Sequence, residues 1–231
     1  MMSKKLLVAC EESQRVCTAF RTVGWEAYSC DLQECSGAHP EWHIIQDVRR
    51  VMNGNCKFVT CDGVEHEIVG RWDMIIAHPP CTYMSVAGAC RMYPHKGQID
   101  HARLEKAMAA KEFFMELYNA DCDRVCIENP TPLKVVGLPQ ATQVIQPYQF
   151  GEPWSKRTLL WLRGLDPLEP TGIVTDYKPF VPSGTGRKLG GETYGAAIPH
   201  EGKARSVTFK GIAKAMAEQW GDLDKQMCKL A

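Results

Sequence analysis

Residues 72–85 read WDMIIAHPPCTYMS, an apolar run that ends abruptly at His78-Pro79-Pro80-Cys81. Proline lacks the backbone N–H and fixes φ, so two prolines cannot continue a strand or a helix. The run therefore predicts a short buried strand over residues 71–77 followed by a stiff turn. The turn leaves Cys81 just past the strand end, where its thiol is either a buried structural group or a presented one.

Length and composition narrow the class of protein. The chain of 231 residues is long enough for one sizeable core, and Lys+Arg and Asp+Glu both total 27, so any basic surface must be local. The first apolar run is too short for a signal-peptide core, and no stretch approaches the length of a membrane span. Eleven cysteines without a secretory signal indicate reduced thiols, so we expect a cytoplasmic protein.

Apolar stretches alternate with helical patterns along the chain. Strands are predicted at 5–10, 25–30, 42–47, 71–77 and 123–129, and helices at 13–23, 101–120 and 206–220. This alternation predicts an α/β fold, a mainly parallel twisted sheet with helices on both faces. Residues 58–68 predict a hairpin that turns at Asp62-Gly63, and residues 144–162 predict two strands around a turn.

Each of these five strands ends in polar or acidic residues. The strand ends are Cys10-Glu11-Glu12, Asp31, Asp47, His78 to Cys81, and Glu128-Asn129. In an open α/β sheet the ligand crevice lies beyond the carboxyl ends of the strands, so these side chains should meet at one edge. One polar strand end is ordinary turn chemistry, but five together predict a ligand site.

The first turn, CEES over residues 10–13, contains no glycine, so it is neither a phosphate-binding loop nor a dinucleotide fingerprint. Glu11 and Glu12 would repel a phosphate and attract a cation. Asp31 ends the second strand, where a carboxylate either accepts hydrogen bonds from a ribose or caps a turn. A ligand with a ribose and positive charge but no phosphate suits this turn, and S-adenosyl-L-methionine has those features.

Cys81 and Glu128 form the candidate catalytic pair. A cysteine on a rigid turn near a helix start can stay partly exposed with a lowered pKa, and its thiolate is then a nucleophile. Glu128, at the neighbouring strand end, is placed to act as proton donor. His78 is an alternative base, in which case the chain would be a cysteine-nucleophile enzyme that does not act on nucleic acid.

These motifs resemble those of DNA (cytosine-5) methyltransferases, of the compact kind found in phages and prophages. AHPPCTY (77–83) resembles the Pro-Cys nucleophile motif, and IENP (127–130) resembles the Glu-Asn-Val motif, with Asn129 supporting the loop. The resemblance implies a Rossmann-like, S-adenosyl-L-methionine-dependent methyltransferase fold, in the cytoplasm of a bacterium or a phage-infected host cell. It also implies that Cys81 adds to carbon 6 of cytosine, Glu128 serves ring nitrogen 3, and carbon 5 takes the methyl group.

The resemblance extends to the cofactor side. The implied cofactor-binding residues are Cys10, Glu11, Glu12, Ser13, Asp31, Asp47, Val48 and Pro79. Residues 149–162 resemble a segment with a Gln-x-Arg-x-Arg core, although Trp154, Lys156 and Thr158 stand at its key positions. Residues 204–220 resemble the closing motif that folds back onto the cofactor pocket.

Three parts follow from the resemblance. They are a catalytic cofactor-binding domain (1–163), a loop-rich region that would be a reduced target-recognition segment (164–204), and a C-terminal helix packed on the catalytic domain (205–231). DNA contact requires local positive charge. The candidates are Lys156, Arg157, Arg187, Lys188 and Arg205, each of which is otherwise ordinary surface charge. The 181–195 loop, with Tyr194, would support a duplex opened by base flipping.

Other interpretations stay open. Amino-methyltransferases acting on exocyclic nitrogens carry Asp, Asn or Ser before Pro-Pro and an aromatic residue directly after, whereas here His78 and Cys81 flank the prolines. The altered first turn favours a nucleic-acid-binding protein with an inactive methyltransferase fold. Zinc-like spacing occurs at Cys30, Cys35, His39 and His43, but Cys30 lies inside a predicted strand, so we predict no metal site.

Overall fold

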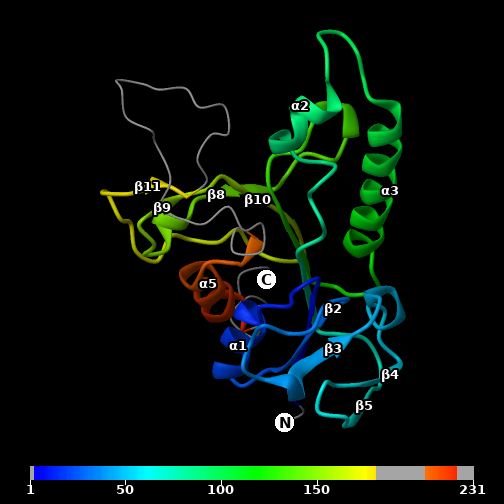
Figure 1. The fold of residues 1–231 in the computed structure, drawn as a ribbon. Helices are drawn as coiled ribbons and strands as arrows, with labels where there is room; N and C mark the ends of the chain where they lie inside the picture. Colours follow the sequence, from blue (N-terminus) through cyan, green and yellow to red (C-terminus); the bar gives the residue numbers. More distant parts are fainter. Residues whose placement is uncertain (1–2, 181–205, 223–231) are drawn as a thin grey trace.

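The computed structural model describes residues 3–180 and 206–222, and within these ranges its main feature is a seven-stranded sheet (Figure 1). The strand order is β3-β2-β1-β6-β7-β10-β8. The strands are β1 (Lys5–Ala9), β2 (Glu26–Asp31), β3 (His43–Ile45), β6 (Met74–Ala77), β7 (Val125–Asn129), β8 (Gln143–Ile145) and β10 (Thr158–Arg163).

Strand direction and order define a doubly wound sheet. Strands β3, β2, β1, β6 and β7 are parallel neighbours, while β10 is antiparallel to both β7 and β8. The chain runs outward from β1 to β3 and then crosses back to β6, so the order reverses between β1 and β6. In such sheets ligands bind at the carboxyl ends beside this switch point. The predicted α/β class with a mainly parallel sheet is confirmed.

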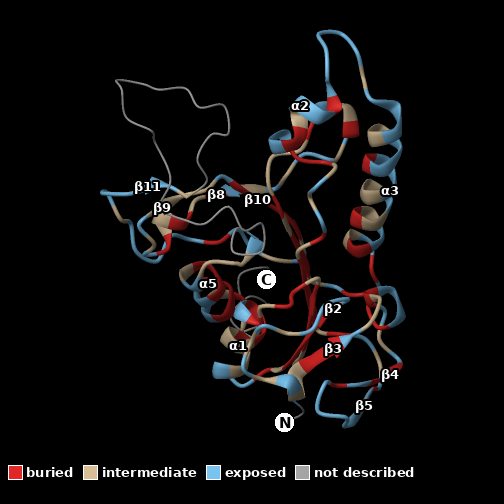
Figure 2. Cartoon of the chain, in the orientation of Figure 1, coloured by how far each residue is buried: buried red, intermediate tan, exposed pale blue. Residues whose placement is uncertain are grey.

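Apolar side chains of the sheet alternate between two cores. On β1, Leu6 and Val8 belong to one core, and Leu7 and Ala9 to the other. Helices α1 (Arg15–Thr22) and α5 (Lys210–Trp220) lie side by side over the first face, and α3 (His101–Tyr118) covers the second (Figure 1). The central strands are therefore buried on both sides (Figure 2), which explains why they read as continuous apolar runs.

Helix α3 has a clear start and a specific packing partner. The Asp100 side chain accepts a hydrogen bond from the Arg103 N–H at 2.9 Å, which caps the first turn. Phe114 on its buried face meets Trp161 of β10 edge to face, with ring centroids 5.1 Å apart. The helix ends at Tyr118, two residues before the predicted end.

Smaller elements decorate the sheet. The predicted hairpin is present as β4 (Cys56–Val59) and β5 (Glu65–Ile68), with Gly63 of its turn at φ +84°. Residues 144–162, where two strands were predicted, contribute to three, β8, β9 (Trp154–Ser155) and β10. The additional strand, β9, lies outside the main sheet and pairs with β11 (Lys178–Pro179). The short helical turns are η1 (Pro40–Trp42), η2 (Val48–Arg50), η3 (Val86–Gly88), α2 (Ala89–Met92), η4 (Lys134–Val136) and η5 (Pro147–Gln149).

The division of the chain at residues 163 and 204 stays a prediction. In the predicted C-terminal part, α5 packs against α1 on the sheet. The adjoining Gly221 carbonyl accepts a hydrogen bond from the Trp25 indole N–H at 2.9 Å. In the two ranges that the structure describes, no helix has the length and apolar character needed to cross a membrane.

The contact between Phe114 and Trp161 should be a main anchor of α3. Phe114→Ala is expected to lower the free energy of unfolding by about 3–5 kcal/mol, because it leaves a cavity between helix and sheet. Met108, on the exposed side of the same helix, provides the control: Met108→Ala should change stability by about 0.5 kcal/mol or less. Urea unfolding followed by circular dichroism measures both, and equal losses would contradict the assigned packing.

Candidate functional site

The register of three strands brings their carboxyl ends to one level. Ala9 of β1 pairs with Ala77 of β6, which pairs with Ile127 of β7. The His78 N–H then donates to the Ala9 carbonyl at 2.9 Å and extends the ladder by one residue. The next residue on β7 is Glu128, so the structure places His78 beside it at the switch point.

His78 and Glu128 form a buried pair. The Nδ1 atom of His78 lies 3.2 Å from Oε2 of Glu128, and the two side chains are only 9% and 15% exposed. Burial alone would lower the pKa of His78, but its hydrogen bond to Glu128 and the charges of Glu128 and Glu11 outweigh burial and raise this pKa. Burial alone would raise the pKa of Glu128, but the hydrogen bond from His78 and the charges of Lys156 and His78 outweigh it and lower that pKa.

Cys81 is half-buried after the two prolines, and its thiol is not activated at rest. Burial raises the pKa of Cys81, and the charge of Glu128 raises it further. The charge of Lys156 and a hydrogen bond with Ser85 oppose this rise without cancelling it. The lowered pKa predicted for Cys81 is therefore wrong, because the turn places the sulfur in a dry region beside a carboxylate.

Lys156 belongs to this group although the sequence predicted it only as a DNA contact. It lies in the turn between β9 and β10, and its charge lowers the pKa of both Cys81 and Glu128. Its Nζ atom lies 5.9 Å from the centroid of the Phe180 ring and 5.8 Å from that of Phe209. Two aromatic faces thus hold the ammonium group close to the candidate nucleophile and acid.

Of the other predicted DNA contacts, the structure describes only Arg157. Arg157 is exposed, and its Nε donates to Oγ1 of Thr131 at 3.3 Å, just beyond the end of β7. Arg187, Lys188, Arg205 and Tyr194 lie outside the described residues, as does the 181–195 loop. DNA contact by any of these side chains remains a prediction.

Asn129 holds the turn that carries Cys81. It is 1% exposed, and its Nδ2 donates to the Pro79 carbonyl at 2.9 Å. Pro79, predicted on the cofactor side, is thereby fixed through its backbone oxygen. This bond between the β6 turn and the end of β7 fits the supporting role predicted for Asn129.

Glu11 and Glu12, the carboxylates predicted for the cofactor, have partners within the protein. Oε1 of Glu11 accepts from the Val16 N–H at 2.7 Å and Oε2 from the Cys17 N–H at 3.1 Å, so Glu11 caps the start of α1. Glu12 accepts hydrogen bonds from the hydroxyl and the backbone N–H of Ser36. Burial raises the pKa of Glu11, although the charge of His78 and the two backbone hydrogen bonds oppose this rise.

The backbone of the first turn is unusual. Cys10 and Gln14 have φ values of 58° and 57°, a left-handed conformation that residues with side chains rarely adopt. Gln14 also ties the turn to the loop after β2, because its Nε2 donates to the His39 carbonyl at 2.7 Å and its Oε1 accepts from the His39 N–H at 3.1 Å. Ser13 is half-buried beside it. Strain of this kind is commonly retained at functional sites.

Asp31, Asp47 and Cys10 form a second group at the ends of β1 to β3. Burial raises the pKa of the Cys10 thiol, and the charges of Asp31 and Asp47 raise it further, so both carboxylates face it. Asp31 Oδ1 accepts from the Gln33 N–H at 2.9 Å. A hydrogen bond from the Arg49 N–H, at 3.0 Å, and the Arg49 guanidinium lower the pKa of Asp47. Val48, next along, packs into the core.

The histidines and cysteines of the zinc-like spacing have other roles. His43 uses both ring nitrogens, Nδ1 with Ser29 Oγ at 2.8 Å and Nε2 with the Gln33 carbonyl at 2.9 Å. His39 stacks on Trp42, and the Cys30 thiol donates to the Gln46 carbonyl. In the described parts of the chain, no three or more His, Cys, Asp or Glu side chains are grouped to hold a metal ion.

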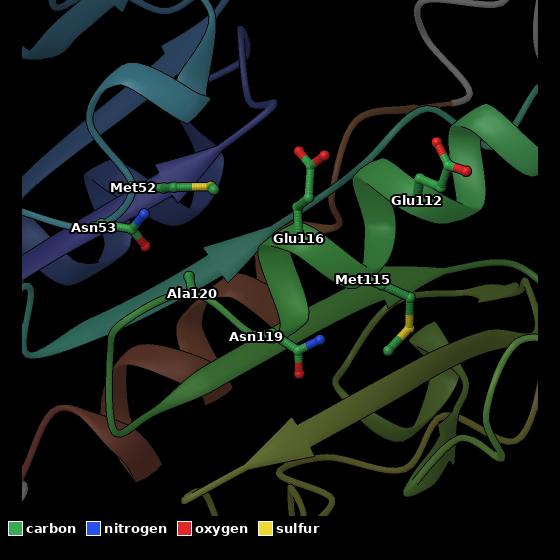
Figure 3. Close-up of a pocket in the computed structure, with 7 residues that line it drawn as sticks. All are labelled: Met52, Asn53, Glu112, Met115, Glu116, Asn119 and Ala120. Atoms are coloured by element: carbon green, nitrogen blue, oxygen red, sulfur yellow. The ribbon is translucent and has the colours of Figure 1, made fainter.

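A depression of about 600 Å³ lies elsewhere, between α3 and the loop after η2 (Figure 3). Its lining residues are Met52, Asn53, Glu112, Met115, Glu116, Asn119 and Ala120. Glu116 also pairs with Arg49, which holds Asp47, so this wall is linked to the second group. It contains none of the predicted catalytic residues, and the candidate site therefore rests on strand register and contacts.

Sequence reasoning missed three contributors to the site and gave a fourth, Lys156, a different role. Ser36 and Gln14 anchor the first turn through contacts 24 and 25 residues away in the chain, which no local pattern reveals. Lys156 was identified but assigned only to DNA. Ser85 stands four residues after Cys81, a spacing typical of a helical turn, and its N–H donates to the Cys81 carbonyl at 3.0 Å. Of these residues, only Ser85 could have been connected with Cys81 from its position in the sequence.

Comparisons with known proteins give a limited picture. No protein-family model matches the chain, and no curated protein matches it significantly. Among solved structures, it is similar to an Escherichia coli chain described as a candidate DNA modification methyltransferase encoded within a prophage. The TM-score is 0.39 and the sequence identity 13%, and the match covers 74% of this chain. It spans only about half, 52%, of that chain.

The opposing charges around Cys81 can be measured through its reactivity. Glu128→Gln should speed alkylation of Cys81 by iodoacetamide roughly threefold or more, because removing the carboxylate lowers the thiol pKa and only the thiolate reacts. Lys156→Gln should slow it for the opposite reason. The rates come from mass spectrometry of digested protein at mildly alkaline pH, with the exposed Cys90 as internal reference. Equal Cys81 rates in all three proteins would show that neither charge faces the thiol.

Proposed function

We propose that this protein is a DNA (cytosine-5) methyltransferase that uses Cys81 as nucleophile, Glu128 as acid and S-adenosyl-L-methionine as methyl donor. The observation that carries the proposal is electrostatic. Glu128 belongs to β7 and Lys156 to the turn between β9 and β10, yet the charges of both shift the pKa of Cys81, so thiol, carboxyl and ammonium come together near the switch point. Amino-methylation of an exocyclic nitrogen requires no thiol there.

The strand order adds support for the methyltransferase class. A fully parallel doubly wound sheet would continue past β7 with another parallel strand, whereas here the reversed β10 lies between β7 and β8. This arrangement is consistent with the Rossmann-like methyltransferase fold that the sequence motifs imply. It also brings the turn before β10, with Lys156, to the edge where β6 and β7 end.

The acidic residues around the first turn are complementary in charge to a cationic ligand that contains a ribose. Asp31 and Asp47 are acidic groups at the ends of β2 and β3, and both face Cys10. Asp31 would accept hydrogen bonds from ribose hydroxyls, and Asp47 and Val48 would border the base. Glu11 and Glu12 would act through their negative field, since their oxygens already hold protein donors. When bound, S-adenosyl-L-methionine supplies an electrophilic methyl group.

The catalytic residues would act in sequence on a flipped-out cytosine. The Cys81 thiol loses its proton to solvent and the resulting thiolate bonds to carbon 6, while protonated Glu128 donates its proton to ring nitrogen 3, which gives carbon 5 its nucleophilic character. While Glu128 is protonated it carries no charge that opposes ionisation of Cys81, so the acid form of Glu128 also favours the thiolate. Loss of the carbon 5 proton after methylation expels the thiolate and restores the enzyme.

Replacement of Cys81 tests the proposal directly. Cys81→Ser should lower DNA methylation by roughly a thousandfold or more, because serine is a much weaker nucleophile at this position. It should also abolish the covalent complex with DNA that contains a mechanism-based cytosine analogue. Methylation is measured with labelled methyl donor, and mass spectrometry of the digested DNA identifies the modified base.

Cys90→Ser, at an exposed cysteine in α2, is the matched control and should methylate normally. If Cys81→Ser keeps full activity, the cysteine mechanism is wrong. If the product is an N-methylated adenine or cytosine, the protein is an amino-methyltransferase instead.

Asp31 provides a separate test of the cofactor side. Asp31→Asn should weaken S-adenosyl-L-methionine binding roughly tenfold, because a charged acceptor for the ribose becomes a neutral one. Asp62 makes the same kind of turn contact, accepting from the Val64 N–H at 3.3 Å, but it lies in the β4–β5 hairpin. Asp62→Asn should therefore bind normally in calorimetric titration. Equal affinities in both variants would remove Asp31 from the cofactor site, and absence of wild-type binding would favour an inactive fold.

A further inference from the structure

His78 has no role in the chemistry proposed above, yet it touches the group that must give up a proton. Its Nδ1 lies 3.2 Å from Glu128 Oε2, and register alone places the two side chains on the same face of neighbouring strands. Glu128 also has a difficulty as acid. Its pKa is lowered, chiefly because the hydrogen bond from His78 and nearby positive charge outweigh its burial, so at rest it is a carboxylate without a proton to donate.

Comparison with His43 separates a structural histidine from this one. His43 is fully buried and both of its ring nitrogens hydrogen-bond, to Ser29 and to the Gln33 carbonyl. His78 is nearly as buried, but its Nε2 makes no hydrogen bond to the described residues. A buried histidine with a purely structural role would normally form hydrogen bonds through both ring nitrogens. Within the part of the chain that the structure describes, His78 does so only through Nδ1, and its partner there is Glu128.

We propose that His78 is a positioning residue that stores the proton which Glu128 delivers to the base. This inference rests on the proposed function. His78 first passes its proton to the Glu128 carboxylate, so the His78 Nδ1–H bond breaks and a Glu128 O–H bond forms. That O–H bond then breaks as ring nitrogen 3 of the base takes the proton. The pair thus loses one proton to the base. It recovers that proton when nitrogen 3 is deprotonated on release of the methylated cytosine, so the proton count of the cycle balances.

The charges around His78 support this storage role. The charged groups that act on His78 are Glu128 from β7, Glu11 from the first turn and Lys156 from the turn before β10. Burial would lower the pKa of His78, but the two carboxylates together outweigh burial and Lys156, and they raise it. The two carboxylates therefore stabilise the imidazolium form that burial alone would disfavour.

The pH dependence of methylation separates storage from packing. His78→Asn keeps an amide N–H near the Nδ1 position but cannot carry the proton. Its methylation should fall off at a lower pH than that of the wild type, so the gap in kcat/KM widens with rising pH to roughly tenfold or more. A purely structural loss would lower the rate equally at every pH. His66→Gln, at the hairpin histidine that contacts Tyr28, is the control and should follow the wild-type profile.

An NMR titration tests the pair without relying on activity. Glu128→Gln should lower the pKa of the His78 ring, because the partner that raises it is gone. An unchanged His78 pKa would overturn the proposed pair. A wild-type pH profile in His78→Asn would overturn the storage role while leaving the cysteine mechanism intact. Absence of 5-methylcytosine from the wild-type reaction would instead overturn the proposed function, and with it this role.

Stability measurements guard against misfolding of the variant. Because the pKa of His78 is raised in the folded protein, its pairing with Glu128 stabilises the fold fully below the ordinary histidine pKa of 6.5. This stabilisation is lost as the pH rises through the folded-state pKa. The lowered pKa of Glu128 means its contribution is present above 4.5 and is lost as pH falls through the folded-state value. His78→Asn should therefore cost most stability between these limits. If His78→Asn fails to fold, His78→Gln takes its place as the test of the storage role. The same shifted pH profile is expected for His78→Gln, and a wild-type profile would overturn the storage role.

Discussion

The parallel register of β1, β6 and β7 is the constraint on which the rest of the site depends. These three strands stay apolar up to the same level, Ala9, Ala77 and Ile127, and the residues that follow are Cys10, His78 and Glu128. Side chains alternate strictly between the two faces of a sheet, so a slip of β6 by one residue would turn His78 toward α3. The pair with Glu128 would then be lost. Burial of both faces is what prevents such a slip.

Much of this arrangement could be predicted from the sequence because its causes are local. Apolar runs that stop at acidic or proline-rich turns define the parallel strands, and strand alternation with helices defines the class of sheet. The Asp62-Gly63 turn indicated the hairpin for a similarly local reason, since glycine accepts the left-handed φ found there. Convergence of Cys10, His78 and Glu128 follows from parallel strands alone.

Properties that depend on distant partners could not be predicted. Glu11 and Glu12 look like free carboxylates in the sequence, but α1 and Ser36 supply donors that occupy their oxygens. The pKa of Cys81 depends on dryness and on charges from β7 and the β9–β10 turn. No pattern around residue 81 contains that information. A rigid proline turn indicates that a thiol is presented, but it does not indicate whether the thiol is ionised.

The reversed direction of β10 has a consequence for the order in which the protein is made. Lys156 enters the site before β10 begins, but the rings beside its ammonium come from Phe180 and from Phe209 at the start of α5. Synthesis proceeds from the N-terminus, so a nascent chain holds Cys81 and Glu128 long before it holds the groups that position Lys156. The edge that carries Cys81 and Glu128 is thus completed only after residue 209 has been synthesised, and a chain released before that point would carry Cys81 without its full electrostatic surroundings.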